Sequence, residues 1–128
     1  MMFTSTRSVH IFAYPAPVDL RKGYDGLSGL VSTGLQGNVL DGALYLFVNL
    51  QRTTCKVLHW DGTGLCLFAK RLERGRFAAL WRAGAGAADS ATAVLTLSTT
   101  ELALFIEGCT LVGKHVLTPV ALQFPKQQ

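Results

Sequence analysis

Hydrophobic and polar positions alternate most regularly in the middle of the chain. Polar and apolar residues alternate over 54–57, residues 65–69 are all apolar, and the four residues 61–64 contain Asp-Gly and a second glycine. Such alternation predicts β-strands, and Asp-Gly predicts a tight turn because glycine adopts positive φ without steric cost. We therefore predict an antiparallel hairpin in which Trp60 faces Leu65 and Lys56 faces Ala69. The other face would hold Cys55, Val57 and His59 with Cys66, Phe68 and Lys70.

Other segments predict further strands. Val9 to Tyr14 is a short apolar run closed by two prolines, and Ala43 to Val48 is strongly β-forming. Weaker patterns predict a strand around 76–81 and an edge strand at 94–97.

A first helix is predicted from Asp19 onwards, where the pattern changes to helical spacing. Its apolar positions are Leu20, Tyr24, Leu27, Leu30 and Val31. We expect Asp19 to be the N-cap, because its carboxylate can accept hydrogen bonds from the unpaired amides of the first turn. Gly34 or Gly37 would end this helix.

A second helix is predicted near the end of the chain. Ser98 to Glu101 matches a capping box, the next residues give an apolar face, and Gly108 provides a stop. Together these elements predict an α+β fold: a small antiparallel sheet with a central hairpin and two helices packed on one face. We expect residues 1–128 to form a single domain. A flexible linker at about 82–93 would precede the C-terminal strand and helix, because that stretch is rich in Ala and Gly.

Composition adds an expectation about partners. Hydrophobic residues make up 49% of the chain and charged residues 16%, below the usual fraction of about a quarter. We therefore expect a partner to cover apolar surface, through self-association or contact with another protein. The longest apolar run is too short to span a membrane, and the N-terminus does not resemble a signal peptide. Three cysteines without a close pair fit a reducing compartment, so we expect a cytoplasmic protein.

Positive charge is concentrated in one part of the chain. Seven Lys and Arg residues lie between Gln51 and Arg82, against two acidic residues. A localised basic segment on a nearly neutral body is typical of a polyanion-binding surface. Two alternatives remain open: the basic residues only solubilise an apolar protein, or they bind an acidic protein partner. The candidate nucleic-acid-binding residues are Arg21, Lys22, Lys56, Lys70, Arg71, Arg74 and Arg76.

No catalytic, metal or cofactor site is predicted. Gly108 to Lys114 matches the first seven positions of a P-loop, but His115 replaces the hydroxyl residue that would hold magnesium. Cys55, His59 and Cys66 share a predicted face but lack the close cysteine spacing of structural zinc sites. The carboxylates have adequate structural roles in caps, turns and loops, so we expect no enzymatic activity.

Three segments carry a resemblance to a known family: Pro17 to Leu27, Trp60 to Phe77, and Glu101 to Gly108. In this order and spacing the chain resembles, from about Val9 to Gly108, the second-frame proteins (often called TnpB or Orf2) of insertion sequence 66 elements. The resemblance implies a non-catalytic accessory protein of DNA transposition, encoded beside a larger acidic-triad transposase. The partners that the resemblance implies are DNA, either the ends of the element or duplex of any sequence, and the transposase and other accessory proteins of the same element. Two hypotheses remain: DNA binding through the basic hairpin edge, or an adaptor that docks on the transposase without touching DNA.

Overall fold

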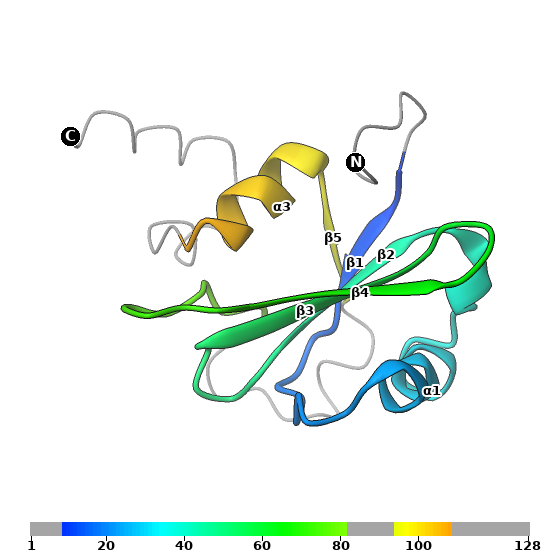
Figure 1. The fold of residues 1–128 in the computed structure, drawn as a ribbon. Helices are drawn as coiled ribbons and strands as arrows, with labels where there is room; N and C mark the ends of the chain where they lie inside the picture. Colours follow the sequence, from blue (N-terminus) through cyan, green and yellow to red (C-terminus); the bar gives the residue numbers. More distant parts are fainter. Residues whose placement is uncertain (1–8, 82–93, 109–128) are drawn as a thin grey trace.

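A five-stranded mixed sheet forms the centre of the protein (Figure 1). The computed structural model describes residues 9–81 and 94–108. In the sheet order β4-β3-β2-β1-β5, the strands are Leu65–Arg71, Thr54–Trp60, Leu44–Val48, Ile11–Ala13 and Leu95–Leu97. Two α-helices, α1 (Tyr24–Gly34) and α3 (Thr99–Ile106), pack on this sheet, and a 3-10 turn, η2 (Val39–Asp41), precedes β2. The predicted α+β class is confirmed.

The central hairpin has the predicted register. Trp60 lies opposite Leu65 and Lys56 lies opposite Ala69 in the antiparallel pair of β3 and β4. The turn is held by Asp61, whose Oδ1 accepts hydrogen bonds from the amides of Thr63 and Gly64 at 2.9 and 3.0 Å. These bonds favour the ionised carboxyl and lower the pKa of Asp61 to about 2.

The prediction of an entirely antiparallel sheet is wrong, because β1 and β2 are parallel. The Leu44 amide donates to the His10 carbonyl, and the Tyr14 amide donates to the Leu46 carbonyl, both at 2.9 Å. Between these strands the chain crosses one face of the sheet through α1, so it re-enters the sheet in its original direction.

The prediction that both helices pack on one face is also wrong. Figure 1 shows α3 above the sheet and α1 below it. Leu27 and Val31 of α1 pack with one set of β2 side chains, Tyr45 and Phe47. The buried residues of α3 pack with the alternate set, which consists of Leu44, Leu46 and Val48. Every residue of β2 is buried, so other elements must cover both faces of this strand. The sequence signal for this arrangement was the continuous apolar run of β2, which is typical of strands buried on both faces.

Helix α1 begins at Tyr24, five residues after the predicted N-cap Asp19. The cause lies just before the helix, where the Val18 amide donates to the Val48 carbonyl at 3.0 Å and keeps the chain extended beside β2. The Asp19 carboxylate instead accepts from the backbone and guanidinium of Arg21. The helix ends at Gly34, as predicted.

The second predicted helix is confirmed, with its capping box. The Ser98 amide donates to the Glu101 carboxylate at 2.8 Å, and the Glu101 amide donates to the Ser98 hydroxyl at 3.1 Å. Gly108 follows the helix with a φ of +80°, a conformation that favours glycine. The predicted edge strand is present as β5, beside β1.

The strand predicted around 76–81 is not formed. Phe77 is fully buried and stacks on Phe105 of α3, with ring centroids 5.0 Å apart. The backbone amide and carbonyl of Phe77 both form hydrogen bonds with Arg52, not with a neighbouring strand, so this segment does not form a β-ladder. It fills the core beneath α3 as irregular backbone. The predicted linker at 82–93 lies outside the described residues.

Candidate nucleic-acid interface

The arginine-rich segment 72–76 forms a loop whose two ends are fixed side by side. The Leu72 amide donates to the Thr53 carbonyl at 2.8 Å, and the Phe77 amide donates to the Arg52 carbonyl at 2.7 Å. Both acceptors belong to the connection between β2 and β3, so the four residues between Leu72 and Phe77 must project and return. Gly75 has a φ of +74° near the tip of this loop. The sequence therefore presents two arginines on a short, anchored projection.

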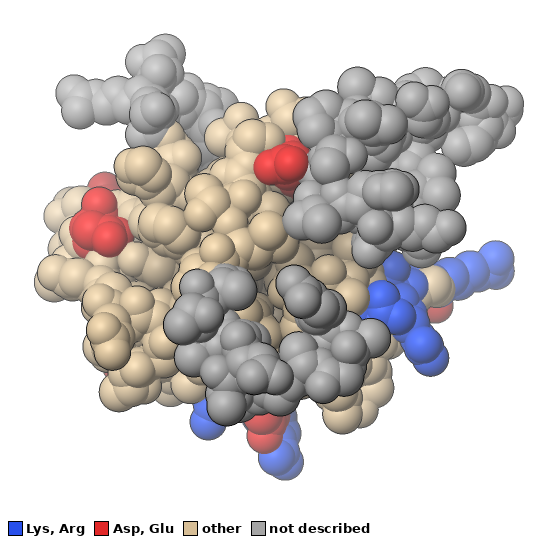
Figure 2. All heavy atoms as spheres, turned by 180° about the vertical axis from the view of Figure 1, so that it is seen from behind, with Lys and Arg blue, Asp and Glu red and all other residues tan. Residues whose placement is uncertain are grey.

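Arg74 and Arg76 are both exposed on this loop, as is Arg71 at the end of β4. Figure 2 shows Lys and Arg side chains gathered where the end of β4 and the following loop project, on the right of that view. A second group lies at the lower edge. No described acidic side chain lies within 4.0 Å of these three guanidinium groups.

Lys56 links the hairpin to the segment before α1. Its Nζ donates to the Lys22 carbonyl at 3.2 Å, which holds two cationic residues close together. Lys56 and Arg71 point to the α1 face of the sheet. Lys56 is two residues from Leu58 in β3, and Arg71 is four residues from Leu67 in β4, and both leucines pack in the cluster that contains α1. The two side chains are diagonal neighbours, within reach of one phosphate backbone.

Arg21 extends this region but is already paired. Its Nη2 lies 2.6 Å from the Asp19 carboxylate, and 91% of the Arg21 side chain is exposed. Hydrogen bonds from Arg21 hold the pKa of the Asp19 carboxyl well below its usual range. The pair therefore carries little net charge at neutral pH.

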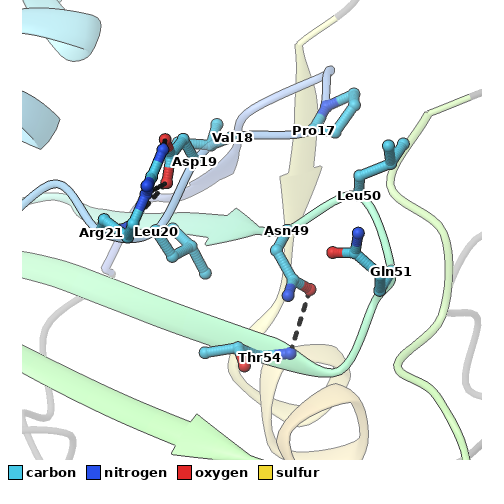
Figure 3. A pocket seen from close by; sticks show the side chains of 9 residues that line it. All are labelled: Pro17, Val18, Asp19, Leu20, Arg21, Asn49, Leu50, Gln51 and Thr54. Carbon is cyan, nitrogen blue, oxygen red and sulfur yellow. Dashed lines mark hydrogen bonds and ion pairs between the residues drawn. The ribbon is translucent and has the colours of Figure 1, made fainter.

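A hollow of about 630 Å³ lies beside the Asp19–Arg21 pair (Figure 3). Pro17 and Val18 contribute to one wall, and Leu50, which is 66% exposed, to another. The Asn49 side chain shapes this wall, because its Oδ1 accepts from the amides of Thr53 and Thr54. The hollow therefore combines apolar residues with polar ones, Asn49, Gln51 and Thr54, and with the Asp19–Arg21 ion pair.

Lys70 lies apart from the other six candidate residues. It points to the α3 face, and its Nζ donates to the Ile106 carbonyl in the last turn of α3 at 2.8 Å. A cation at a helix C-terminus satisfies an unpaired carbonyl and interacts favourably with the helix dipole. The geometry gives this lysine a structural role. Of the other six, Lys22 and Lys56 are joined by a hydrogen bond, and Arg71 is a diagonal neighbour of Lys56. We call these six candidate residues the cationic surface: Arg21, Lys22, Lys56, Arg71, Arg74 and Arg76.

Arg52 was not a candidate, yet it supports the arginine loop. Its Nη1 donates to the Phe77 carbonyl at 3.1 Å, and its φ is +60°. Non-glycine residues rarely adopt this conformation, so the surrounding bonds must hold it in place. The only sequence signal was its position within a short polar loop, which does not distinguish an arginine that supports the fold from one that binds a partner.

The described residues offer little for catalysis. Burial raises the pKa of the Cys55 thiol to about 12, and burial together with Asp61 raises that of Cys66. Both shifts reduce the fraction of thiolate, which is the nucleophilic form. Within residues 9–81 and 94–108, no three His, Cys, Asp or Glu side chains converge as a metal site would require. The P-loop-like segment lies almost wholly beyond these residues.

Comparison with known proteins identifies the family. The family described as "IS66 Orf2 like protein" matches residues 9–115, most of the chain. The chain belongs to the IS66 Orf2-like family. This membership implies an accessory role in the transposition of an insertion sequence.

Two relatives of this IS66 Orf2-like chain come from Sinorhizobium fredii (strain NBRC 101917 / NGR234). Uncharacterized protein y4hO is 34% identical over 107 residues, which cover 84% of this chain and 86% of that protein. Uncharacterized protein y4jC is 33% identical over 76 residues, which cover 59% of this chain and 65% of that protein. No solved structure matches the chain significantly. None of the helices in the described parts of the chain has the length and hydrophobicity needed to cross a membrane.

Proposed function

We propose that this protein binds duplex DNA during transposition of its element, through the cationic surface. The observation that carries the proposal is the anchored loop with exposed Arg74 and Arg76. Among the described residues, the only ion pair within 4.0 Å joins Arg21 to Asp19, so no described acidic side chain pairs with the arginines of the loop. Guanidinium groups bind phosphate oxygens with two parallel hydrogen bonds, which makes arginine well suited to this contact.

The form of the loop also favours a phosphate contact. A Cβ built on Gly75 would meet no atom within 4 Å, so the backbone there is open to a close approach. Lys56 and Arg71 continue the positive charge along the sheet towards Lys22. Contacts of this type fix the position of a protein on DNA but do not read its sequence. We therefore propose a positioning role, in which the transposase supplies the chemistry.

The proposal is tested by fluorescence anisotropy with two labelled duplexes of equal length, one from an element end and one random. Wild type should bind both. The double variant Arg74→Ala/Arg76→Ala should lose roughly tenfold or more in affinity on both, because two charged contacts are removed. The matched control, Arg74→Lys/Arg76→Lys, keeps the charge and should retain most of the binding. Unchanged affinity of a folded alanine variant would overturn the proposal.

A second candidate is an adaptor that docks on the transposase without DNA contact. The hollow beside Arg21 favours it, because two of its lining residues, Pro17 and Leu50, are exposed apolar residues next to the Asp19–Arg21 ion pair. In this alternative, Leu50→Asp should abolish capture of the element's transposase, whereas Arg74→Ala/Arg76→Ala should not. Transposase capture that is unaffected by Leu50→Asp would remove the support for this candidate.

A further inference from the structure

Strand β4 forms one edge of the sheet and pairs only with β3 among the described residues. It is the longest edge available, with seven residues, whereas the opposite edge strand, β5, has three. An unpaired edge exposes amides and carbonyls that can bind another strand. The outer side of β4 is therefore a candidate interaction surface.

The hydrogen bonds at the two ends of the hairpin show which backbone groups point outward. The Asp61 amide donates to the Gly64 carbonyl, and the Leu72 amide donates to the Thr53 carbonyl. In an antiparallel pair, hydrogen-bonded and non-hydrogen-bonded positions alternate. Positions 66, 68 and 70 of β4 therefore direct their backbone groups to β3. The residues whose amides and carbonyls point outward are Leu65, Leu67, Ala69 and Arg71.

Few features protect this edge from pairing. The strand contains no proline, glycine or acidic residue, and its first four residues are apolar and only half-buried. Natural edge strands are usually protected by prolines, bulges, inward-pointing charges or short length. Here positive charge occurs only at the C-terminal end, and Lys70 is already bonded to α3. No described residue makes a hydrogen bond to the outward-pointing groups.

We propose that β4 pairs with β4 of a second copy of the chain, antiparallel and about a two-fold axis. The distribution of charge on the strand favours this occupant and this direction. In a parallel pair in register, Arg71 would face Arg71 of the other copy. In an antiparallel pair centred on Phe68, Arg71 faces Leu65 and Lys70 faces Cys66, so like charges stay apart. Such a contact is isologous, and it closes at a dimer.

The pairing would extend the sheet without a break from one copy to the other. Residues opposite each other in an antiparallel pair point to the same face. The α1 faces of both copies would therefore lie on the same side of a ten-stranded sheet. Lys56 and Arg71 of both copies would then lie on that side, although the pairing itself does not depend on DNA.

The substitution Ala69→Pro tests the pairing, because it removes an outward-pointing amide and leaves the bonds to β3 intact. Proline is tolerated in edge strands when its nitrogen faces outward. The control Ala69→Val changes the same exposed side chain but keeps the amide. In analytical ultracentrifugation without DNA, wild type and Ala69→Val should be dimers and Ala69→Pro a folded monomer. A monomeric wild type at high micromolar concentration, or a folded Ala69→Pro dimer, would overturn the proposal.

Amide hydrogen exchange of the wild type tests the pairing even if Ala69→Pro fails to fold. The amides of Leu67 and Ala69 should become more protected as the protein concentration rises through the dimerisation range. The amides of Cys66 and Phe68, which bond to β3, should be protected at all concentrations. Protection of Leu67 and Ala69 that does not change with concentration would contradict pairing between copies. Because no DNA is present, this result is independent of the proposed DNA contact.

Discussion

Replacing Lys70 with methionine distinguishes a structural role from a DNA-binding role for this side chain. Methionine keeps the length and apolar stem but removes the ammonium that donates to the Ile106 carbonyl at 2.8 Å. A part-buried bond from a charged donor to a helix C-terminus contributes about 1–2 kcal/mol. For a chain of this size, the loss should lower Tm by about 4–8 °C.

Urea denaturation followed by tryptophan fluorescence measures this effect. The midpoint should fall by roughly 0.5–1 M with an unchanged slope, since the same surface is exposed on unfolding. The same substitution at Lys56 is the matched control, because its bond to the Lys22 carbonyl is longer, at 3.2 Å, and exposed. Lys56→Met should cost less than about 0.5 kcal/mol but weaken DNA binding. The structural role of Lys70 would be refuted if Lys70→Met were as stable as the wild type. It would also be refuted if Lys70→Met lost as much DNA affinity as Lys56→Met.

Three further substitutions test local features of the fold. The pKa of Asp61 is lower in the hairpin turn than in the unfolded chain, so the ionised carboxyl stabilises the protein above about pH 4, and this stability is lost as pH falls towards 2. The difference in Tm between wild type and Asp61→Asn should therefore shrink as pH falls over that range. A constant difference would contradict this reasoning. Ser98→Ala removes one half of the capping box and should lower the free energy of unfolding by about 1 kcal/mol in urea titrations. Gly75→Ala places a side chain at a φ of +74° in open space and should cost about 1 kcal/mol without disrupting the fold; an unfolded variant would show that the loop is more constrained than described.

The hairpin and the capping box could be predicted because short-range rules determine them. A four-residue turn fixes one register, which places Val57 opposite Phe68 and Leu58 opposite Leu67. Ser98 and Glu101 satisfy each other's amides without help from the rest of the chain. Both features therefore follow from residues that are close in sequence.

The errors arise where distant segments decide the outcome. The start of α1 depends on the bond between Val18 and Val48, which local sequence does not reveal. The placement of the helices on opposite faces depends on β2, whose apolar run was interpreted as a strand but not as one buried on both sides. Among the candidate residues, Lys70 and Arg74 belong to the same basic motif. Only the position of α3 separates the lysine that caps a helix from the arginine that faces solvent.

The most direct test of the proposed DNA contact is the salt dependence of binding. Each phosphate neutralised on a duplex releases counterions, so log affinity falls against log salt with a slope of about −0.9 per contact. If Arg74 and Arg76 each contact a phosphate, Arg74→Ala/Arg76→Ala should make the slope shallower by about 2, and Arg74→Lys/Arg76→Lys should leave it nearly unchanged. If the folded alanine variant keeps the wild-type slope and affinity, the cationic surface does not bind DNA through this loop.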